Sequence, residues 1–193
     1  MSEHYNSSQA LYQALWNCAD ILRSKMDANE YKSYLLGLVF YKYLSDNLVF
    51  HAVNLLEESA DTLSAALEVY RQGYADESIH DDLVETLVDE YSYCIEPDLT
   101  FTALVQQINE GTFQLENLAQ GFRNIEQENS IFENLFEDID IYSKKLGSTP
   151  QKQNKVISDI MKALDEIDVV NHSGDMLGDA YEYLIGQFAT ESG

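Results

Sequence analysis

Four histidines and two cysteines are the side chains of this sequence best suited to metal binding or acid–base chemistry. The histidines are His4, His51, His80 and His172. They show no His-x-x-x-His spacing and no acidic partner at a ligand offset, so ordinary surface or partly buried histidines are expected. Cys18 and Cys94 lie within apolar patterns, which is typical of reduced core thiols rather than of a disulfide or a metal pair.

Carboxylates and nucleophiles give no clearer sign of catalysis. The cluster Glu-Asp-Ile-Asp at 137–140 lacks the alternation and the glycine of a calcium loop, so a solvated helix end is the expected reading. No glycine-rich phosphate loop occurs, and no motif surrounds a Ser, Thr or Cys nucleophile. A triad assembled in space remains an alternative. The sequence therefore predicts no complete active site, no metal site and no cofactor site within these residues.

The charge of the chain is strongly negative and unevenly spread. Its 193 residues carry 34 Asp and Glu against 11 Lys and Arg, a net charge of -23 that exceeds what solubility requires of a small domain. Between Lys42 and Arg123 the only cation is Arg71, whereas residues 143–163 contain five lysines and one aspartate. A partner that recognises charge would meet two very different surfaces.

Each of these surfaces has an ordinary and a functional interpretation. The acidic positions of 81–89 form a solvated exterior, or alternatively a docking surface for a basic partner or a mimic of DNA phosphates. The lysines either balance helix C-terminal dipoles or contact phosphate or an acidic neighbour. The candidate DNA-facing lysines are Lys144, Lys145, Lys152, Lys155 and Lys162.

The elements that would position these groups are helices. Only two prolines and nine glycines occur, and apolar residues recur with helical spacing almost throughout, which predicts an all-α multi-helix bundle. A first helix is expected over 9–25. Residues 79–95, 118–125, 132–139 and a segment beginning at Thr149-Pro150 show the same periodicity. At most a very short extended segment is expected, near 92–100.

The segment 26–46 is the most apolar of the chain and is expected to be the central helix of the bundle. Asp27 and Glu30 resemble a capping box at its start. Apolar residues follow on opposite sides of the helix, and a helix that is apolar all round must be enclosed by other helices. Gly37 lowers helix propensity by about 1 kcal/mol relative to Ala, which suggests a close helix–helix approach there.

The composition changes at 168–174, which is the predicted linker. We expect a helical N-terminal domain over 1–167 and a further helix over 175–193, whose apolar stripe would contact another domain. The residues of this candidate domain interface are Leu177, Tyr181, Leu184 and Phe188. No signal peptide is visible and no apolar run reaches the about 20 residues of a membrane helix, so a soluble, cytoplasmic protein without membrane contact is expected.

Three spaced segments resemble one known family. They are ALWNCADILRSKMDANEYKSYLLGLVFYKYLSD at 14–46, LFEDIDIYSKKLG at 135–147 and DMLGDAYEYLIGQFA at 175–189. In this order they are similar to the N-terminal part of the modification (DNA methyltransferase) subunit of type I restriction-modification systems. The resemblance implies that 1–167 is a helical domain and that 175–193 is the opening helix of a catalytic domain.

The resemblance also limits what this chain is expected to do. In the family an S-adenosylmethionine pocket follows, and then an Asn-Pro-Pro motif that holds a flipped adenine. Pro97 and Pro150 are the only prolines here, so neither catalytic nor cofactor residues of the family can be assigned to this sequence. The implied protein is an adenine methyltransferase that uses S-adenosylmethionine, whereas this chain alone is predicted to be inactive and to bind no cofactor.

The implied partners are the specificity subunit, the restriction subunit and DNA within their complex. The net charge predicts weak or no DNA binding by the chain alone, with the lysines at 144–162 as the DNA-facing patch. A homodimer through 175–193 is an alternative arrangement. Two other readings remain open at this point: a free-standing acidic DNA mimic or protein-interaction module, and a small all-α enzyme with a site assembled across helices.

Overall fold

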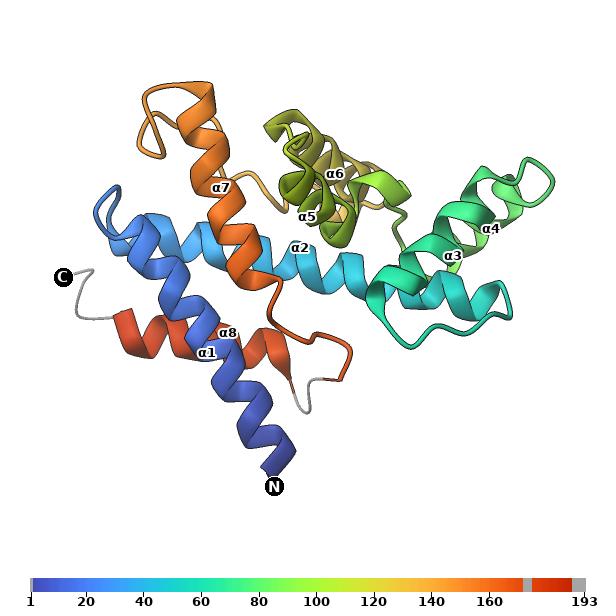
Figure 1. The fold of residues 1–193 in the computed structure, drawn as a ribbon, viewed down its shortest axis with the longest axis horizontal. Helices are drawn as coiled ribbons and strands as arrows, with labels where there is room; N and C mark the ends of the chain where they lie inside the picture. Colours follow the sequence, from blue (N-terminus) through green and yellow to red (C-terminus); the bar gives the residue numbers. More distant parts are fainter. Residues whose placement is uncertain (1, 172–174, 189–193) are drawn as a thin grey trace. The chain divides into compact units, whose positions relative to one another are not determined.

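The computed structural model describes residues 2–171 and 175–188, with side chains from residue 8 to residue 187 of those ranges (Figure 1). The α-helices are α1 (Ser2–Leu22), α2 (Ala28–Leu55), α3 (Leu63–Ala75), α4 (His80–Tyr91), α5 (Phe101–Glu110), α6 (Leu115–Glu128), α7 (Pro150–Leu164) and α8 (Met176–Phe188). Two short 3-10 helices are η1 (Pro97–Leu99) and η2 (Ser130–Phe132). No strand occurs in this part of the chain, so the predicted all-α fold is confirmed.

Contacts divide the chain into two compact units. The first comprises Met1–Tyr41 and Phe136–Gly193, and the second comprises Lys42–Leu135. The helix α2 contributes its first half to one unit and its second half to the other. This division differs from the boundary expected at 168–174, which remains a prediction about where one domain of a longer protein ends.

The first unit is built around α1, which packs on α7 and α8. Apolar residues at helical spacing on α1 are fully buried, as are those on α7. They are Leu11, Leu15, Cys18, Ala19 and Leu22 of α1, and Ile157, Ile160, Met161 and Leu164 of α7. The helix α1 begins seven residues before the predicted start at residue 9, whereas α7 begins as predicted, with Thr149 Oγ1 accepting the Lys152 N–H at 3.3 Å and Pro150 in the first turn.

The second unit contains the pair α3 and α4 followed by α5 and α6. The helix expected over 79–95 ends at Tyr91, because Ser92 adopts a left-handed conformation with φ 75°. The chain then turns inward: the Tyr70 hydroxyl donates to the Ile95 carbonyl at 2.6 Å, which fixes the approach to η1. The residues between α4 and η1 form no strand.

The prediction for α2 as an enclosed helix is confirmed. From Tyr31 to Phe50 every side chain is buried or half-buried, on all sides of the helix. Enclosure of this kind requires neighbours around the full circumference. In the described ranges, none of the helices combines the length and the apolarity that crossing a membrane would require.

The helix expected over 132–139 is absent. The Asn129 side chain accepts the Ile131 N–H at 3.1 Å and starts the short helix η2 instead, and Asn134 takes a positive φ of 59°. Turns follow up to residue 138. The apolar side chains Phe136 and Ile139 are nevertheless buried. The apolar spacing of this segment therefore indicated which residues are buried, but it did not indicate a helix.

Candidate functional site

Asp27, immediately before α2, caps the first turn of this helix. The Asp27 Oδ1 accepts the backbone N–H of Glu30 at 3.0 Å, and the Asp27 carbonyl accepts the N–H of Tyr31 at 3.1 Å. A capping carboxylate satisfies a backbone donor that the helix itself leaves unpaired. The predicted helix start at Asp27 is therefore confirmed.

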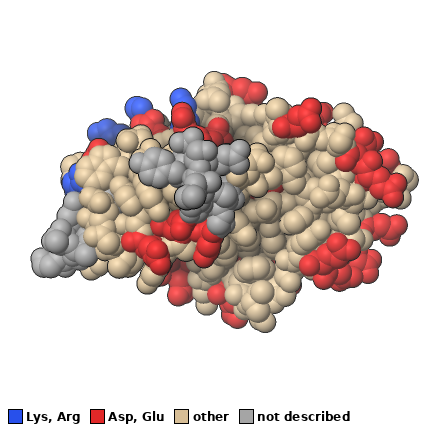
Figure 2. Space-filling model, turned by 90° about the horizontal axis from the view of Figure 1, so that it is seen from below, with Lys and Arg blue, Asp and Glu red and all other residues tan. Residues whose placement is uncertain are grey.

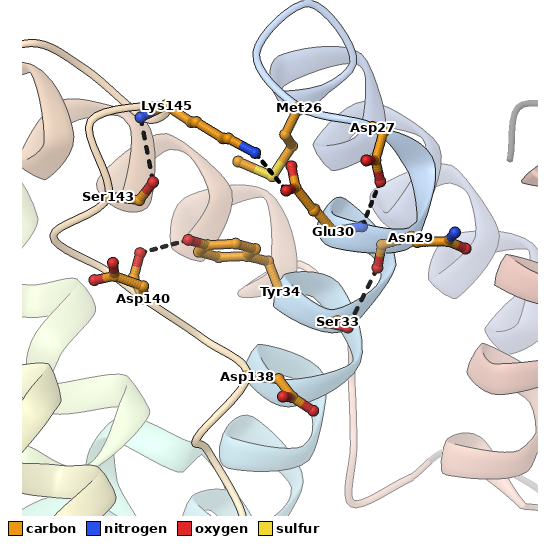
Figure 3. Close-up of a pocket in the computed structure, with 10 residues that line it drawn as sticks. All are labelled: Met26, Asp27, Asn29, Glu30, Ser33, Tyr34, Asp138, Asp140, Ser143 and Lys145. Carbon is orange, nitrogen blue, oxygen red and sulfur yellow. Dashed lines mark hydrogen bonds and ion pairs between the residues drawn. The ribbon is translucent and has the colours of Figure 1, made fainter.

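The irregular segment 138–146 contacts the first two turns of α2 at two places (Figure 3). The Tyr34 hydroxyl donates to the backbone carbonyl of Asp140, and the Lys145 ammonium pairs with the Glu30 carboxylate. Both contacts join residues more than one hundred positions apart in the sequence. The segments 26–34 and 138–145 belong to two of the three sequence motifs. They contact each other here, and we call this contact the joint.

A pocket of about 490 Å³ lies at this joint, and we call it the acidic pocket. Four carboxylates and one ammonium group line it, from Asp27, Glu30, Asp138, Asp140 and Lys145. The hydrogen bond that Lys145 donates to Glu30 raises the pKa of Lys145, and the negative charges of Glu30 and Asp27 act in the same direction. An ammonium group in this setting stays protonated and neutralises part of the local negative charge.

Tyr34 is a buried residue whose hydroxyl lines the acidic pocket. Burial raises the pKa of Tyr34, and the negative charge of Asp140 adds to the effect, while hydrogen bonds with Ser143 and with the Asp140 backbone oppose it. The hydroxyl therefore remains a hydrogen-bond donor at neutral pH, which its bond to the Asp140 carbonyl requires.

The polar groups of the acidic pocket mostly bind one another. Asp140 Oδ1 accepts the Tyr142 N–H at 3.0 Å, Ser33 Oγ donates to the Asn29 carbonyl at 3.3 Å, and Ser143 Oγ accepts the Lys145 N–H at 3.2 Å. In the residues that the structure describes, no group of three or more His, Cys, Asp or Glu side chains could hold a metal ion. This arrangement is more typical of a structural contact between two segments than of a catalytic site.

A glycine brings the same two segments into close contact. A Cβ at Gly37 would lie 1.9 Å from Ile139 Cδ1 and 3.0 Å from its Cγ1. The close approach that the glycine suggested is real, but its partner is a side chain of an irregular segment and not a second helix. The expectation of a helix–helix contact at Gly37 was wrong because the segment 132–139 is not helical.

Farther along α2, three polar residues of the motif Lys-Tyr-Leu-Ser-Asp are buried, at Lys42, Ser45 and Asp46. The Lys42 Nζ lies 2.7 Å from Asp46 Oδ2 and 4.9 Å from the ring centroid of Phe101. The Ser45 Oγ accepts the Phe101 N–H at 2.7 Å, which satisfies the first backbone donor of α5. These residues, the α2–α5 clamp, hold the start of α5 against α2.

The predicted DNA-facing lysines all have exposed side chains, on α7 and the segment that precedes it. Their immediate neighbours differ. Lys145 belongs to the acidic pocket, Lys155 Nζ lies 3.0 Å from Asp159 Oδ2, and Lys152 Nζ donates to Ser148 Oγ at 3.4 Å. Figure 2 shows, on the face it presents, the few Lys and Arg side chains gathered at one edge and the Asp and Glu side chains widely spread.

The second unit carries most of the negative charge. Its residues 42–135 include 19 Asp and Glu and three cations, Lys42, Arg71 and Arg123. Each cation is engaged with a carboxylate: Lys42 with Asp46, Arg71 Nε with Asp98 at 3.0 Å, and Arg123 with Glu116. The charged side chains of this unit are therefore overwhelmingly acidic.

The predicted domain-interface residues on α8 differ in burial. Leu184 is fully buried, Leu177 is half-buried and Tyr181 is 55% exposed, while the side chain of Phe188 lies outside the described residues. The buried face of α8 consists of Met176, Ala180 and Leu184, and the Tyr183 ring stacks on Tyr12 of α1 at 4.6 Å. The exposed apolar residues of α8 are Tyr181 and Ile185.

The histidines and cysteines occupy structural positions where the structure describes them. His51 stacks on Tyr91 with ring centroids 3.7 Å apart, and burial lowers its pKa, opposed by the charge of Glu90. His80 Nδ1 lies 2.7 Å from the Tyr74 carbonyl. Both cysteines are buried and reduced, and burial raises the pKa of the Cys18 thiol to about 12. The side chains of His4 and His172 lie outside the described residues.

Sequence reasoning missed the acidic pocket and the α2–α5 clamp. The clamp had a visible signal, because Lys42 and Asp46 stand four residues apart within an otherwise apolar helix, where a lone charge would be costly. The acidic pocket had none, since it joins residues far apart in the sequence. Asp138 and Asp140, expected at a solvated helix end, lie instead in its irregular wall.

Comparison with known proteins shows which family and which structures this chain is similar to. The profile of the family described as "HsdM N-terminal domain" matches residues 11–164. The type I restriction enzyme MpnII methylase subunit of Mycoplasma pneumoniae is 27% identical over an alignment 193 positions long, which covers 93% of this chain and 35% of that protein. A crystal structure of the type I restriction-modification system methyltransferase subunit from Streptococcus thermophilus is 66% identical, with a TM-score of 0.89.

That alignment covers 96% of this chain and 39% of the Streptococcus thermophilus chain. The chain thus spans little more than a third of the length of either relative. The matched profile covers more than half of the present sequence, and it includes both segments that build the acidic pocket as well as the α2–α5 clamp. The chain therefore belongs to the HsdM N-terminal domain family.

Proposed function

We propose that this chain is the non-catalytic N-terminal part of a type I restriction-modification DNA adenine methyltransferase subunit. It supports assembly with the specificity subunit and closure on DNA, in a complex that also includes the restriction subunit. Support comes from the family match and from the two relatives, of which the chain covers 35% and 39%. Methyl transfer belongs to the part of such a subunit that lies outside this sequence.

The cofactor S-adenosylmethionine would supply the methyl group in the full-length subunit. The residues that line the acidic pocket do not fit it. The acidic pocket offers only Met26 and Tyr34 as apolar or aromatic lining for a nucleoside, and the Tyr34 hydroxyl is already bound to Asp140. No step of methyl transfer is therefore assigned to a residue of this chain.

The single observation that carries the proposal is the two-sided apolar character of α8. One side packs on α1, and the other side exposes Tyr181 and Ile185 next to the half-buried Leu177. We infer that 175–193 opens the catalytic domain, that 168–174 is the linker after the helical domain 1–167, and that the exposed side of α8 is covered by the remainder of the catalytic domain. Leu184 is fully buried, whereas Tyr181 is 55% exposed.

Light scattering across a concentration range tests this assignment. An uncovered apolar strip on α8 should make the isolated chain self-associate at high concentration, through a homodimer at 175–193, and Tyr181→Glu should abolish the association. Glu182→Gln, on the adjacent exposed position, is the control and should leave it unchanged. A strictly monomeric wild-type profile would count against the exposed side of α8 as an interface.

We infer the roles of the remaining surfaces from the charge distribution. The anionic surface of residues 42–135 faces protein or solvent, and the lysines at 144–162 face the DNA backbone in the assembled complex. The isolated chain should bind duplex DNA weakly at low salt because its net charge of -23 repels phosphate. Tight binding in a low-salt titration would overturn this assignment.

The anionic second unit also favours a second candidate, an acidic DNA mimic or protein-interaction module. With 19 acidic residues against three cations, residues 42–135 present a density of negative charge that a DNA-binding channel could accept. A competition assay separates the two functions. A mimic would inhibit a DNA-binding enzyme by itself, whereas the N-terminal part of a modification subunit should inhibit poorly.

A further inference from the structure

The five lysines proposed to face DNA are not equally available, and we call them together the basic surface. The Lys145 ammonium pairs with the carboxylate of Glu30 in the first turn of α2. Lys155 Nζ lies 3.0 Å and 3.3 Å from the two carboxylate oxygens of Asp159, one turn farther along α7. Within the described residues no ion pair engages Lys144, Lys152 or Lys162.

The position of Asp159 places it within the basic surface. Lys152, Lys155 and Lys162 are exposed on α7, opposite the buried residues Val156, Ile157, Ile160 and Leu164. At 3.6 residues per turn, positions 152, 155, 159 and 162 fall within about 80° of one another around the helix axis. A strand of phosphates approaching this face of α7 would meet the Asp159 carboxylate between two lysines.

Glu30 is fixed beside Lys145 by the fold. Its backbone N–H donates to Asp27 Oδ1, so the residue cannot leave the first turn of α2 without uncapping the helix. The Tyr34–Asp140 hydrogen bond, one turn later in α2, keeps the segment that carries Lys145 close by. The carboxylate and the ammonium group are therefore held together by contacts that are independent of their charges.

We infer that Glu30 and Asp159 are internal competitors of DNA phosphate at the basic surface, which they hold in a low-affinity state. This inference rests on the proposed function of these lysines. A lysine that leaves its carboxylate for a phosphate releases a counterion from DNA, but the freed carboxylate takes up a cation from solution. The two ion changes cancel, so Lys145 and Lys155 add little affinity and little salt dependence while their carboxylates are present.

The salt dependence of DNA binding measures this competition directly. Each lysine that neutralises a phosphate changes the slope of log K against log salt by about -0.9. Three available lysines predict a slope of about -2.7 for the wild-type chain, and five predict about -4.5 for the variant Glu30→Gln/Asp159→Asn. Between 50 and 200 mM salt, each released lysine should therefore add a roughly 3.5-fold loss of affinity.

The experiment is a fluorescence anisotropy titration of a labelled 20-base-pair duplex with the full 193-residue chain at several salt concentrations from about 20 mM upward. The control is Glu166→Gln/Glu182→Gln, which removes the same two negative charges from exposed positions that pair with no lysine. Circular dichroism checks that each variant keeps its helix content. The variant Lys144→Gln/Lys162→Gln is compared in the Glu30→Gln/Asp159→Asn background.

The expected result is tighter binding and a steeper slope for Glu30→Gln/Asp159→Asn than for the control. Equal slopes in these two variants would overturn the competition. If Lys144→Gln/Lys162→Gln still made the slope shallower by about 1.8, the basic surface would nevertheless contact DNA and the proposed function would stand. If the lysine changes left the slope unaltered, the DNA-facing role itself would be wrong, whereas failure of Glu30→Gln/Asp159→Asn to bind DNA at about 20 mM salt would overturn the competition.

Discussion

Gly37 shows how a single position records a contact between distant parts of the chain. A side chain at this position of α2 would occupy the space of the Ile139 Cδ1 methyl group, 1.9 Å from the place of a Cβ. The residue at 37 is small because Ile139 fills that space, and Ile139 is in turn 9% exposed. The two residues therefore behave as one packing unit.

A double-mutant cycle tests this unit. Gly37→Ala should gain about 1 kcal/mol of helix propensity but lose roughly 1–3 kcal/mol through overpacking, for a net loss of about 1 kcal/mol. Ile139→Val removes the opposing methyl group and should cost about 0.5–1.5 kcal/mol. In the double variant the new methyl replaces the lost one, so its free energy of unfolding should exceed the additive value by about 1 kcal/mol or more.

Urea denaturation followed by circular dichroism gives the four free energies of this cycle. Gly186→Ala is the matched control, because no atom lies within 4 Å of the place of its Cβ and the residue stands in α8. It should be additive with Ile139→Val. Additivity in the Gly37–Ile139 cycle as well would show that the two residues do not share the space.

The residue scale also shows what the sequence could predict. Gly37 within an apolar helix predicted that another segment packs closely against it, and Asp27 predicted the start of α2. Both predictions were possible because they depend on residues only a few positions apart. The identity of the partner at Gly37 could not be predicted, since it lies more than one hundred positions away in a segment whose apolar spacing imitates a helix. The acidic pocket was unpredictable for the same reason.

At the scale of elements, α2 is more than an apolar rod. The α2–α5 clamp places a buried ion pair, Lys42 and Asp46, and the acceptor Ser45 at the start of α5. A buried charge without its partner is costly, whereas an apolar pair of similar size is often tolerated. The clamp therefore predicts opposite outcomes for a single and a double substitution.

The change Lys42→Met leaves the Asp46 carboxylate buried and should lower the free energy of unfolding by about 3–5 kcal/mol. Lys42→Met/Asp46→Leu replaces both charges and should recover most of that loss. Thermal and urea denaturation of the two variants measure the difference. A single variant within about 1 kcal/mol of wild type, or a double variant as unstable as the single one, would refute the clamp as a stabilising contact.

Which helices were predictable follows from their periodicity. The inner faces of α1, α2 and α7 were predicted from apolar spacing and are buried as expected. No expectation delimited α3 and α5, and the segment 132–139 was wrongly expected to be helical. Buried residues at helical spacing arise equally from an irregular segment that touches the core every third or fourth residue, so spacing alone does not distinguish the two.

At the scale of the whole molecule, buried hydroxyl and thiol groups set the response to alkaline pH. Burial raises the pKa of Cys18 to about 12 and raises the pKa values of Tyr41, Tyr70 and Tyr93. The folded chain keeps these protons above the pH at which the unfolded chain loses them. Their contribution to stability is therefore complete below about pH 9 and declines as the pH rises further.

The free energy of unfolding should accordingly fall above about pH 9, by up to about 1.4 kcal/mol per pH unit for each group that ionises only in the unfolded chain. Urea midpoints at about pH 8, 9.5 and 10.5 measure the decline. Tyr70→Phe removes one such group, so the decline should be shallower, although the lost hydrogen bond to Ile95 lowers stability at pH 8. A flat profile over this range would contradict the burial of these groups.

At the scale of the whole protein, we propose that these helices position a methyl-transferring domain that lies outside the chain. The most direct measurement uses the Streptococcus thermophilus methyltransferase subunit, with its matching 39% replaced by this chain. With its specificity subunit and target DNA, the chimera should incorporate radiolabelled methyl groups from S-adenosylmethionine, and Tyr181→Glu/Ile185→Glu should abolish incorporation without unfolding it. Methyl transfer by this chain alone, or full activity of the doubly substituted chimera, would contradict the claim.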